Sequence, residues 1–342
     1  MATATLRRVR APVRRQGWPD TDPILLVVAV LLPLIGVLLV SSARMPEVLG
    51  QDTAFDRGSL VQAGFALGGI ALALVLSRVD YHRWAMVGPV ALVVGWVALI
   101  GLLFYRPPRD VLGAKRWFMI GDDFTIQPSE FVKVALIVTL AYAIDRLGPR
   151  VRSARYALAG LGVLLLVILV PIMAQPDLDT AITIAAVGVV MLFIGGARLW
   201  HLAGLTGVGV LVAGLSLALI QYQRDRLFDF FRPTGDPDGI GYQAVQAKIA
   251  FGFGGITGRG LGEGTQKFRL PLPDSDSVFA VLGEEFGLVG TAVVLVLFLA
   301  LFARGIQVAG ASPDTFGRLL AVGIVTQLTF QAFVNMGVVT GL

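Results

Sequence analysis

The residues best suited to chemistry in this sequence are carboxylates beside long apolar runs. Asp276 stands just before such a run, in the string Asp274-Ser275-Asp276-Ser277. A partly desolvated carboxylate at the edge of a membrane is suited to act as a general base. Capping of the helix that follows is an equally good interpretation of Asp276, and Ser275 or Ser277 could take the same role.

A second candidate group is the string Gln127-Pro128-Ser129-Glu130, which is followed by Lys133. Pro128 predicts a helix start, with Ser129 or Gln127 near the cap and an acidic residue in the first turn. Glu130 and Lys133 are three residues apart and share one helix face. They form either a structural ion pair that neutralises two costly charges or a functional site at membrane depth.

Other chemistry is limited by composition. The chain has no cysteine, so disulfides, thiolate nucleophiles and Cys-ligated metals are excluded. Its two histidines, His82 and His201, leave almost nothing for a Ser-His-Asp triad, a helical zinc site or a histidine proton relay. Acid–base chemistry therefore falls to the carboxylates.

Basic residues gather in two polar segments, 105–129 and 220–277. The first of them also contains Trp117, which either anchors the chain at the membrane interface or stacks on a sugar ring. In the second, a Gly-rich run over 252–264 could cradle a phosphate with its backbone amides or act as a flexible linker. The basic candidates for binding an anionic ligand are Lys115, Arg116, Arg224, Arg226 and Lys248.

The elements that must position these residues are transmembrane helices. Of the 342 residues, 56% are hydrophobic and only 15% are charged, which no soluble fold of this length could bury. Continuous apolar runs, rather than short alternating segments, exclude a β-barrel. Nine spans are predicted, at 24–43, 60–77, 86–104, 130–146, 156–173, 180–195, 199–219, 278–303 and 317–340. A short amphipathic helix is predicted over 241–251.

The charge distribution predicts the orientation of these spans. Residues 1–21 carry five arginines and a single acidic residue, Asp20, and read as a cytoplasmic tail before an uncleaved first span. Lysines and arginines divide almost evenly between the two predicted sides, so the bias alone does not prove orientation. The outer ones are concentrated in the segments 105–129 and 220–277, where an anionic ligand would explain them. We expect no nucleic-acid partner, because in a membrane chain basic residues report orientation and lipid contact.

Six strings, in order, resemble the SEDS family of RodA/FtsW type. They are GAKRW, QPSEFVK, QPDLDTA, YQRDR, GYQAVQAKIAFGFGGITGRGLGEGTQ and DSDSVFAVLGEEFGLVG. The resemblance covers residues 22–342 and implies one transmembrane domain, all-α, with about nine spans present of a ten-span fold and a large outer loop at about 220–277. It places the family's essential outer aspartate at Asp276 and its aromatic loop residue at Trp117. Arg116, Glu130 and Lys133 fall on other matching positions.

The resemblance also implies an activity. A glycosyltransferase in the bacterial plasma membrane would polymerise lipid II, the undecaprenyl-pyrophosphate-linked disaccharide, into peptidoglycan at the outer face, for elongation or division. It implies a class B penicillin-binding protein as partner within a cell-wall synthesis complex, and dependence on a divalent cation, Mg or Mn, whose ligands are unknown. Two alternatives are a lipid II flippase and a non-catalytic scaffold of the same machinery.

The sequence departs from the family pattern at a few positions. Leu272 replaces an acidic residue, Asp274 stands where histidine is common, and Asp179 replaces a glycine. Asp274 is therefore a rival for the role of Asp276. The chain ends inside an apolar run without the family's last span, and we expect it to be a piece of a longer protein.

Overall fold

The computed structural model describes residues 22–44, 57–105, 116–120, 124–219, 221, 224–225, 228, 240–271 and 273–341. The predicted cytoplasmic tail, residues 1–21, lies outside them. The described part is almost entirely helical, as predicted. The helices that coincide with the nine predicted spans are α1 (Pro23–Ala43), α3 (Arg57–Leu76), α4 (Trp84–Phe104), α5 (Pro128–Leu147), the continuous run α6 (Ala154–Tyr156), η3 (Ala157–Gly162) and α7 (Val163–Ala174), α8 (Leu178–Ile194), α9 (Leu199–Leu219), α12 (Val278–Ala311) and α13 (Thr315–Thr340).

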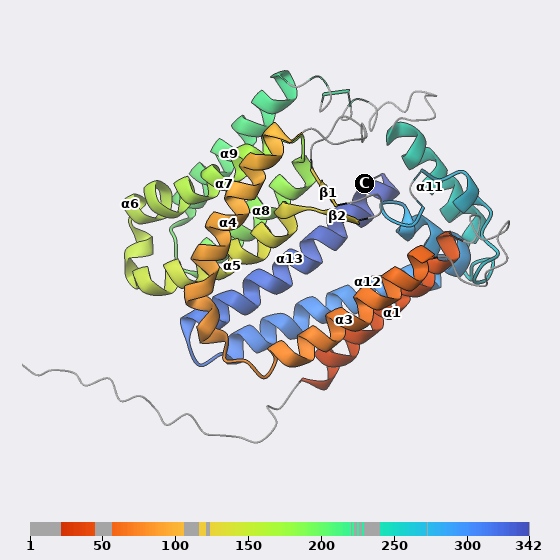
Figure 1. The fold of residues 1–342 in the computed structure, drawn as a ribbon, viewed down its shortest axis with the longest axis horizontal. Coiled ribbons are helices and arrows are strands. Elements are labelled where there is room, and N and C mark those ends of the chain that lie inside the picture. Colours follow the sequence, from red (N-terminus) through yellow and green to blue (C-terminus); the bar gives the residue numbers. More distant parts are fainter. Residues whose placement is uncertain are drawn as a thin grey trace, which may run out of the picture.

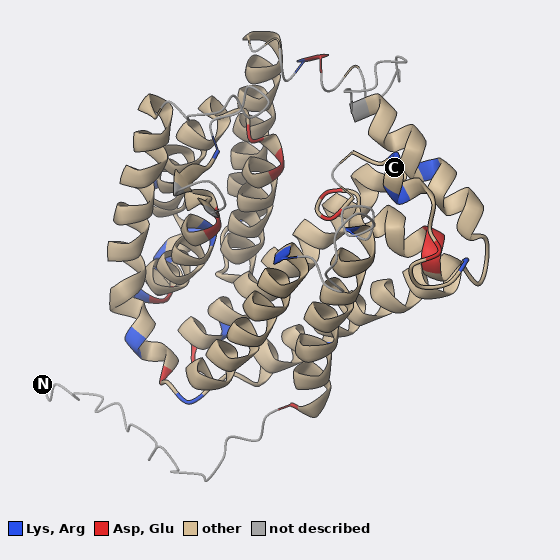
Figure 2. Ribbon diagram, turned by 45° about the vertical axis from the view of Figure 1, so that its right-hand side comes forward, with Lys and Arg blue, Asp and Glu red and all other residues tan. Residues whose placement is uncertain are grey.

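The helices identify a multi-pass membrane protein. In the described ranges, seven are long and apolar enough to cross a membrane. Helix α8 is shorter, with 17 residues, and α5 has 20 residues but contains the charged Glu130, Lys133, Asp145 and Arg146. Figure 2 shows that the long helices carry few charges, which gather mainly at helix ends and in connecting segments.

Helix α13 joins two groups of helices. It packs against α12 on one side and against α5 and α8 on the other. In Figure 1 it runs between the group α4 to α9 and the group α1, α3 and α12. The largest buried cluster lies in the first group and includes Leu99, Val132, Leu140, Ile172 and Met191. The space beside α13 between the two groups is where a site can form.

The short elements are η1 (Tyr81–Arg83), β1 (Phe118–Ile120), β2 (Phe124–Ile126), η2 (Gly148–Arg152), α11 (Ile240–Gly254) and η4 (Gln266–Phe268). Strands β1 and β2 form an antiparallel hairpin that the all-helical prediction did not include. Helix α11 confirms the short helix predicted over 241–251. Its buried face consists of Ala244, Ala247 and Ala250, and small side chains of this kind allow close packing.

Helix α12 is broken at Gly287, where φ is 63° and ψ is −157°. Only glycine adopts such a conformation without strain. The loop after α11 pairs with the freed backbone: Leu288 N–H donates to Gly255 O at 2.9 Å, and Gly260 N–H donates to Glu285 O at 2.9 Å. The span predicted over 278–303 therefore consists of two helical pieces that meet at Gly287, and the loop after α11 holds this break.

Away from the break at Gly287, the segments that precede α1, α4 and α13 make contacts near one another. Asp22 caps α1 by accepting from the Ile24 and Leu25 amides, and its carboxylate pairs with Arg304 of α12. The hydrogen bond from Arg304 and those from the backbone amides lower the pKa of Asp22. Tyr81 donates to Asp314, which precedes α13. The segments before α1, α4 and α13, predicted to share one side of the membrane, thus lie together.

The crossing of α11 and α12 gives a testable packing prediction. A Cβ on Gly254 would lie 1.9 Å from the Gly283 carbonyl oxygen, whereas a Cβ on Gly252 would meet nothing within 4 Å. Because backbone cannot move aside easily, we expect Gly254→Ala to cost about 1–3 kcal/mol of overpacking. The matched Gly252→Ala should be neutral or stabilise by up to about 1 kcal/mol. Thermal unfolding in detergent measures both, and equal midpoints for the two variants would contradict the packing.

Candidate functional site

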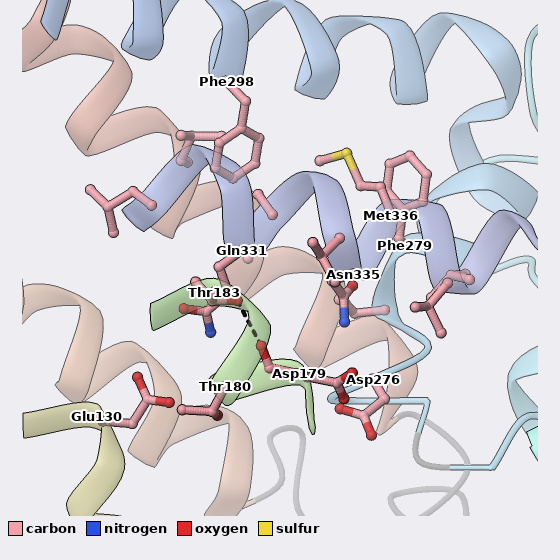
Figure 3. Close-up of a pocket in the computed structure, with 18 of the residues that line it drawn as sticks. Glu130, Asp179, Thr180, Thr183, Asp276, Phe279, Phe298, Gln331, Asn335 and Met336 are labelled. Carbon is pink, nitrogen blue, oxygen red and sulfur yellow. Dashed lines mark hydrogen bonds between the residues drawn. The ribbon is translucent and has the colours of Figure 1, made fainter. Parts of the chain in front are cut away.

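A pocket of about 760 Å³ lies between α1, α5, α8, α12 and α13. Its size falls in the range of small-molecule sites. One part of the lining is polar and includes Arg116, Trp117, Glu130, Lys133, Asp179 and Asp276. The other part is apolar and includes Leu32, Leu39, Leu282, Phe279, Phe298 and Met336. The pocket is therefore amphipathic, and Figure 3 shows the carboxylates of Glu130, Asp179 and Asp276 on a different side of it from Phe279 and Phe298.

Asp276 lies in the pocket lining, at the same end as Asp179 in Figure 3. Its carboxylate has no hydrogen bond or ion pair with the residues that the structure describes, and it is available to a ligand. The N-cap position of α12 is occupied by Ser277 rather than Asp276, and the buried Ser277 side chain makes no capping hydrogen bond. Asp274, the rival acid, instead lies 2.5 Å from Arg44 and does not line the pocket.

Glu130 and Lys133 form the predicted ion pair at the start of α5. Lys133 Nζ lies 2.8 Å from a Glu130 carboxylate oxygen and 2.8 Å from Gln331 Oε1 of α13. The lysine side chain is only 3% exposed. These contacts hold the ammonium group in the lining of the pocket.

Gln331 and Asn335 are pocket residues that the sequence analysis missed. Both come from α13 and point into the pocket in Figure 3. Gln331 Oε1 also accepts from Gln327 Nε2 at 3.0 Å, which fixes the amide orientation. The missed signal is the spacing of Gln327, Gln331 and Asn335 at four-residue intervals in an apolar helix, which places three amides on one face.

The hairpin positions Trp117 and Gln127. Because Phe118 pairs with Ile126, the residues at the open end of the hairpin, Trp117 and Gln127, come close together and both reach the pocket. Gln127 occupies the N-cap position of α5, before Pro128, as predicted. The sequence alone predicted no regular structure for this loop. In the structure the hairpin places the Trp117 side chain at the polar end of the pocket.

The turn before α8 is held by Arg116. Its guanidinium lies 3.8 Å from the Asp177 carboxylate and donates to the Pro176 carbonyl. Asp177, 4% exposed, caps α8 by accepting from the Thr180 amide at 3.4 Å. Since Asp177 caps the helix, Asp179 in the first turn is placed on the pocket wall.

Two of the remaining predicted binding residues, Arg224 and Lys248, do not line the pocket. Arg224 is exposed and lies 3.9 Å from Asp225, its neighbour in the chain. Lys248 is on the exposed face of α11 beside Gly341, because α11 turns its alanine face inward. From α11, Gln243 reaches the pocket instead. Lys115 and Arg226 lie outside the described residues.

The Gly-rich run neither forms a phosphate cradle nor acts as a loose linker. Its backbone pairs with α12, as in Gly260 N–H donating to Glu285 O, and the amides that follow it, at Thr265 and Gln266, donate to the Glu284 carboxylate at 2.8 and 2.9 Å. Glu285 pairs with Lys267 at 3.1 Å, and both side chains are almost completely buried. The anion that these amides bind is therefore a carboxylate of α12, and the run serves to hold the break at Gly287.

The fold and pocket define a polytopic membrane protein with an amphipathic, carboxylate-containing site at one end of its helices. Residues 22–342 match the family model for FtsW, RodA and SpoVE, described as "Cell cycle protein". The chain belongs to this family.

Its relatives span nearly the whole sequence. The probable peptidoglycan glycosyltransferase FtsW of Trichlorobacter lovleyi is 39% identical over 340 residues, covering 98% of this chain and 88% of the relative. Stage V sporulation protein E of Bacillus subtilis is 36% identical over 328 residues, covering 94% and 88%.

Solved structures agree with the fold. A chain of a peptidoglycan synthase complex, described by its coordination of polymerization and crosslinking, has a TM-score of 0.73 and 27% identity, covering 95% of this chain and 89% of that one. The rod shape determining protein RodA of Thermus thermophilus has a TM-score of 0.65 and 26% identity, covering 94% and 86%.

Proposed function

We propose that this chain is a peptidoglycan glycosyltransferase that polymerises lipid II. The observation that carries the proposal is the amphipathic pocket, in which Asp276 has no partner among the described residues. A polar chamber for sugar and diphosphate, joined to an apolar wall, suits an isoprenoid-linked saccharide. The names of the FtsW relatives support the same activity.

In the proposed reaction Asp276 is the general base. Its carboxylate takes the proton from the 4-hydroxyl of the acceptor sugar, and that oxygen attacks the anomeric carbon of the donor chain. One glycosidic bond forms as the bond to the diphosphate breaks, and undecaprenyl diphosphate leaves with the bonding electrons. Trp117 would stack on a sugar ring at the polar end of the pocket.

The leaving diphosphate needs cationic donors. The ammonium of Lys133 and the guanidinium of Arg116 lie in the lining for this role. Because Lys133 is held by Glu130 and Gln331, its ammonium is preorganised rather than free to move. Preorganised donors stabilise developing charge more than mobile ones do.

The resemblance also implies a divalent cation, which would neutralise the diphosphate. Within the described ranges, no three His, Asp or Glu side chains lie close enough together to hold one. Glu130 is paired with Lys133, and Asp177 with Arg116 and the cap of α8. Among the described residues these donors therefore form no preformed site for the cation, and the steps above use protein side chains alone.

We place this activity in the bacterial plasma membrane, with the N-terminus in the cytoplasm and the pocket at the outer face. The clustering of Asp22 with Arg304 and of Tyr81 with Asp314 at the opposite ends of the helices supports this topology. A class B penicillin-binding protein is the proposed partner. Similarity to a chain of a peptidoglycan synthase complex supports it.

The test is reconstitution of the chain in liposomes with lipid II, with and without its penicillin-binding partner. We expect glycan strands that a muramidase degrades, and more of them when the partner is present. Movement of labelled lipid II across the bilayer without any polymer would contradict the proposal and favour a flippase. Neither polymer nor transport, together with normal assembly of the partner, would favour a scaffold.

A further inference from the structure

The segment 273–277, which carries Asp276, is attached to α1 on its N-terminal side. Arg44 is the C-cap residue of α1, and its Nη2 lies 2.5 Å from Oδ2 of Asp274. These two side chains are 30% and 23% exposed. The pair therefore spans 230 positions of sequence to tie the end of a transmembrane helix to the loop that carries the proposed base.

On its C-terminal side the same segment is attached to α11. Gln243 Nε2 donates to Ser277 Oγ at 2.9 Å, and that hydroxyl donates to the Pro271 carbonyl at 2.8 Å. Ser277 is fully buried. Asp276 itself contacts no hydrogen-bond partner in the described part of the chain, so its position depends on these neighbours.

The C-terminal end of α1, to which Asp274 is attached, is itself held in place by buried contacts. Ala43, next to Arg44, is 2% exposed and packs in one buried cluster with Ala247 of α11, Ala280 of α12 and Val339 of α13. One residue earlier, Ser42 donates to Glu285 at 2.5 Å. Three helices, α11, α12 and α13, thus hold the end of α1, and Arg44 extends from it toward Asp274.

We infer that Arg44 and Asp274 are a positioning pair that holds Asp276 in place for catalysis. Asp274 is thereby assigned a role other than that of base. A partly exposed ion pair adds little to the stability of the fold. The effect of losing the Arg44–Asp274 pair should therefore appear in the position of the reacting Asp276 carboxylate. The inference rests on the proposed function, because the rate it concerns is that of glycosyl transfer.

The kinetic test compares Arg44→Gln, Asp274→Asn and the double variant in lipid II polymerisation. A misplacement of about 1 Å can cost about 100-fold in rate. We expect each single variant to lose roughly 10- to 100-fold in kcat with little change in KM. The double variant should lose no more than either single one, because both remove the same contact. Arg44→Lys should keep most of the rate.

The matched control is Arg304→Gln, which breaks the Asp22 pair of similar exposure at the other end of α1. It should leave the rate of polymerisation unchanged. Wild-type rates in the single variants, additive losses in the double variant, or a raised KM for Arg44→Gln alone would each overturn the inference. The last result would mean that Arg44 binds the substrate directly.

A second readout does not depend on activity. Hydrogen exchange of the backbone amides over 270–280 should accelerate in Arg44→Gln and in Asp274→Asn, and should stay at the wild-type rate in Arg304→Gln. Unchanged exchange in all variants would overturn the attachment itself. If the wild type makes no polymer while exchange accelerates as expected, the proposed function fails and the attachment stands.

Discussion

Replacing Lys267 with methionine is expected to lower the free energy of unfolding by about 3–5 kcal/mol, because it leaves a buried carboxylate without its cation. Lys267 Nζ donates to Gly262 O at 2.7 Å, to Glu285 Oε1 at 3.1 Å and to Ser42 Oγ at 3.2 Å. All three ammonium donors are therefore used, and the side chain is 1% exposed. Unfolding in detergent, followed by thermal or denaturant titration, measures the loss.

The control for this prediction is the double variant Lys267→Met with Glu285→Leu. It removes both charges and leaves no uncompensated ion, so most of the lost stability should return. A single variant that loses less than about 1 kcal/mol, the range of exposed pairs, would contradict a buried structural role for Lys267. So would a double variant as unstable as the single one.

The Lys267–Glu285 ion pair matters to the site because it helps to hold the break in α12 at Gly287. Ser42 and Lys267 bind Glu285, while the Thr265 and Gln266 amides bind Glu284. These contacts fix the first piece of α12, whose N-terminal end follows Asp276. In the sequence, the Gly-rich run could be interpreted as a phosphate-binding loop. In the structure it contributes to the pocket indirectly, because it helps to fix the first piece of α12.

The spans were predictable because hydropathy is a local property of the chain. Runs of apolar residues placed all nine helices, and Pro128 placed the start of α5. Asp276, Glu130, Lys133 and Trp117 were also found from residue type and position, and the structure brings them into one pocket.

What the sequence could not supply depends on contacts between distant segments. The break at Gly287 exists because the loop after α11 pairs with the freed backbone, and a glycine in an apolar run gives no sign of that. The attachment of Asp274 to Arg44 likewise joins residues far apart in the chain. Gln331 and Asn335 could have been found from their four-residue spacing, whereas Arg224 and Lys248 were included for charge alone and point elsewhere.

Asp276→Asn is expected to have the largest effect on activity. The amide matches the carboxylate in shape but cannot accept the proton of the acceptor hydroxyl. General-base catalysis contributes about 10²–10⁴-fold, and the rate of polymerisation should fall by that amount. Binding of lipid II should persist, because Lys133, Arg116 and the apolar wall are untouched. The unfolding midpoint should stay near the wild-type value, since Asp276 has no hydrogen-bond partner within the described residues.

The most direct test of Asp276 as the general base is therefore the initial rate of lipid II polymerisation by wild type and Asp276→Asn in liposomes, at equal amounts of bound lipid II. We expect glycan strands from the wild type and a rate at least about 100-fold lower from the variant. Polymerisation by Asp276→Asn at the wild-type rate would contradict the assignment of Asp276 as the base.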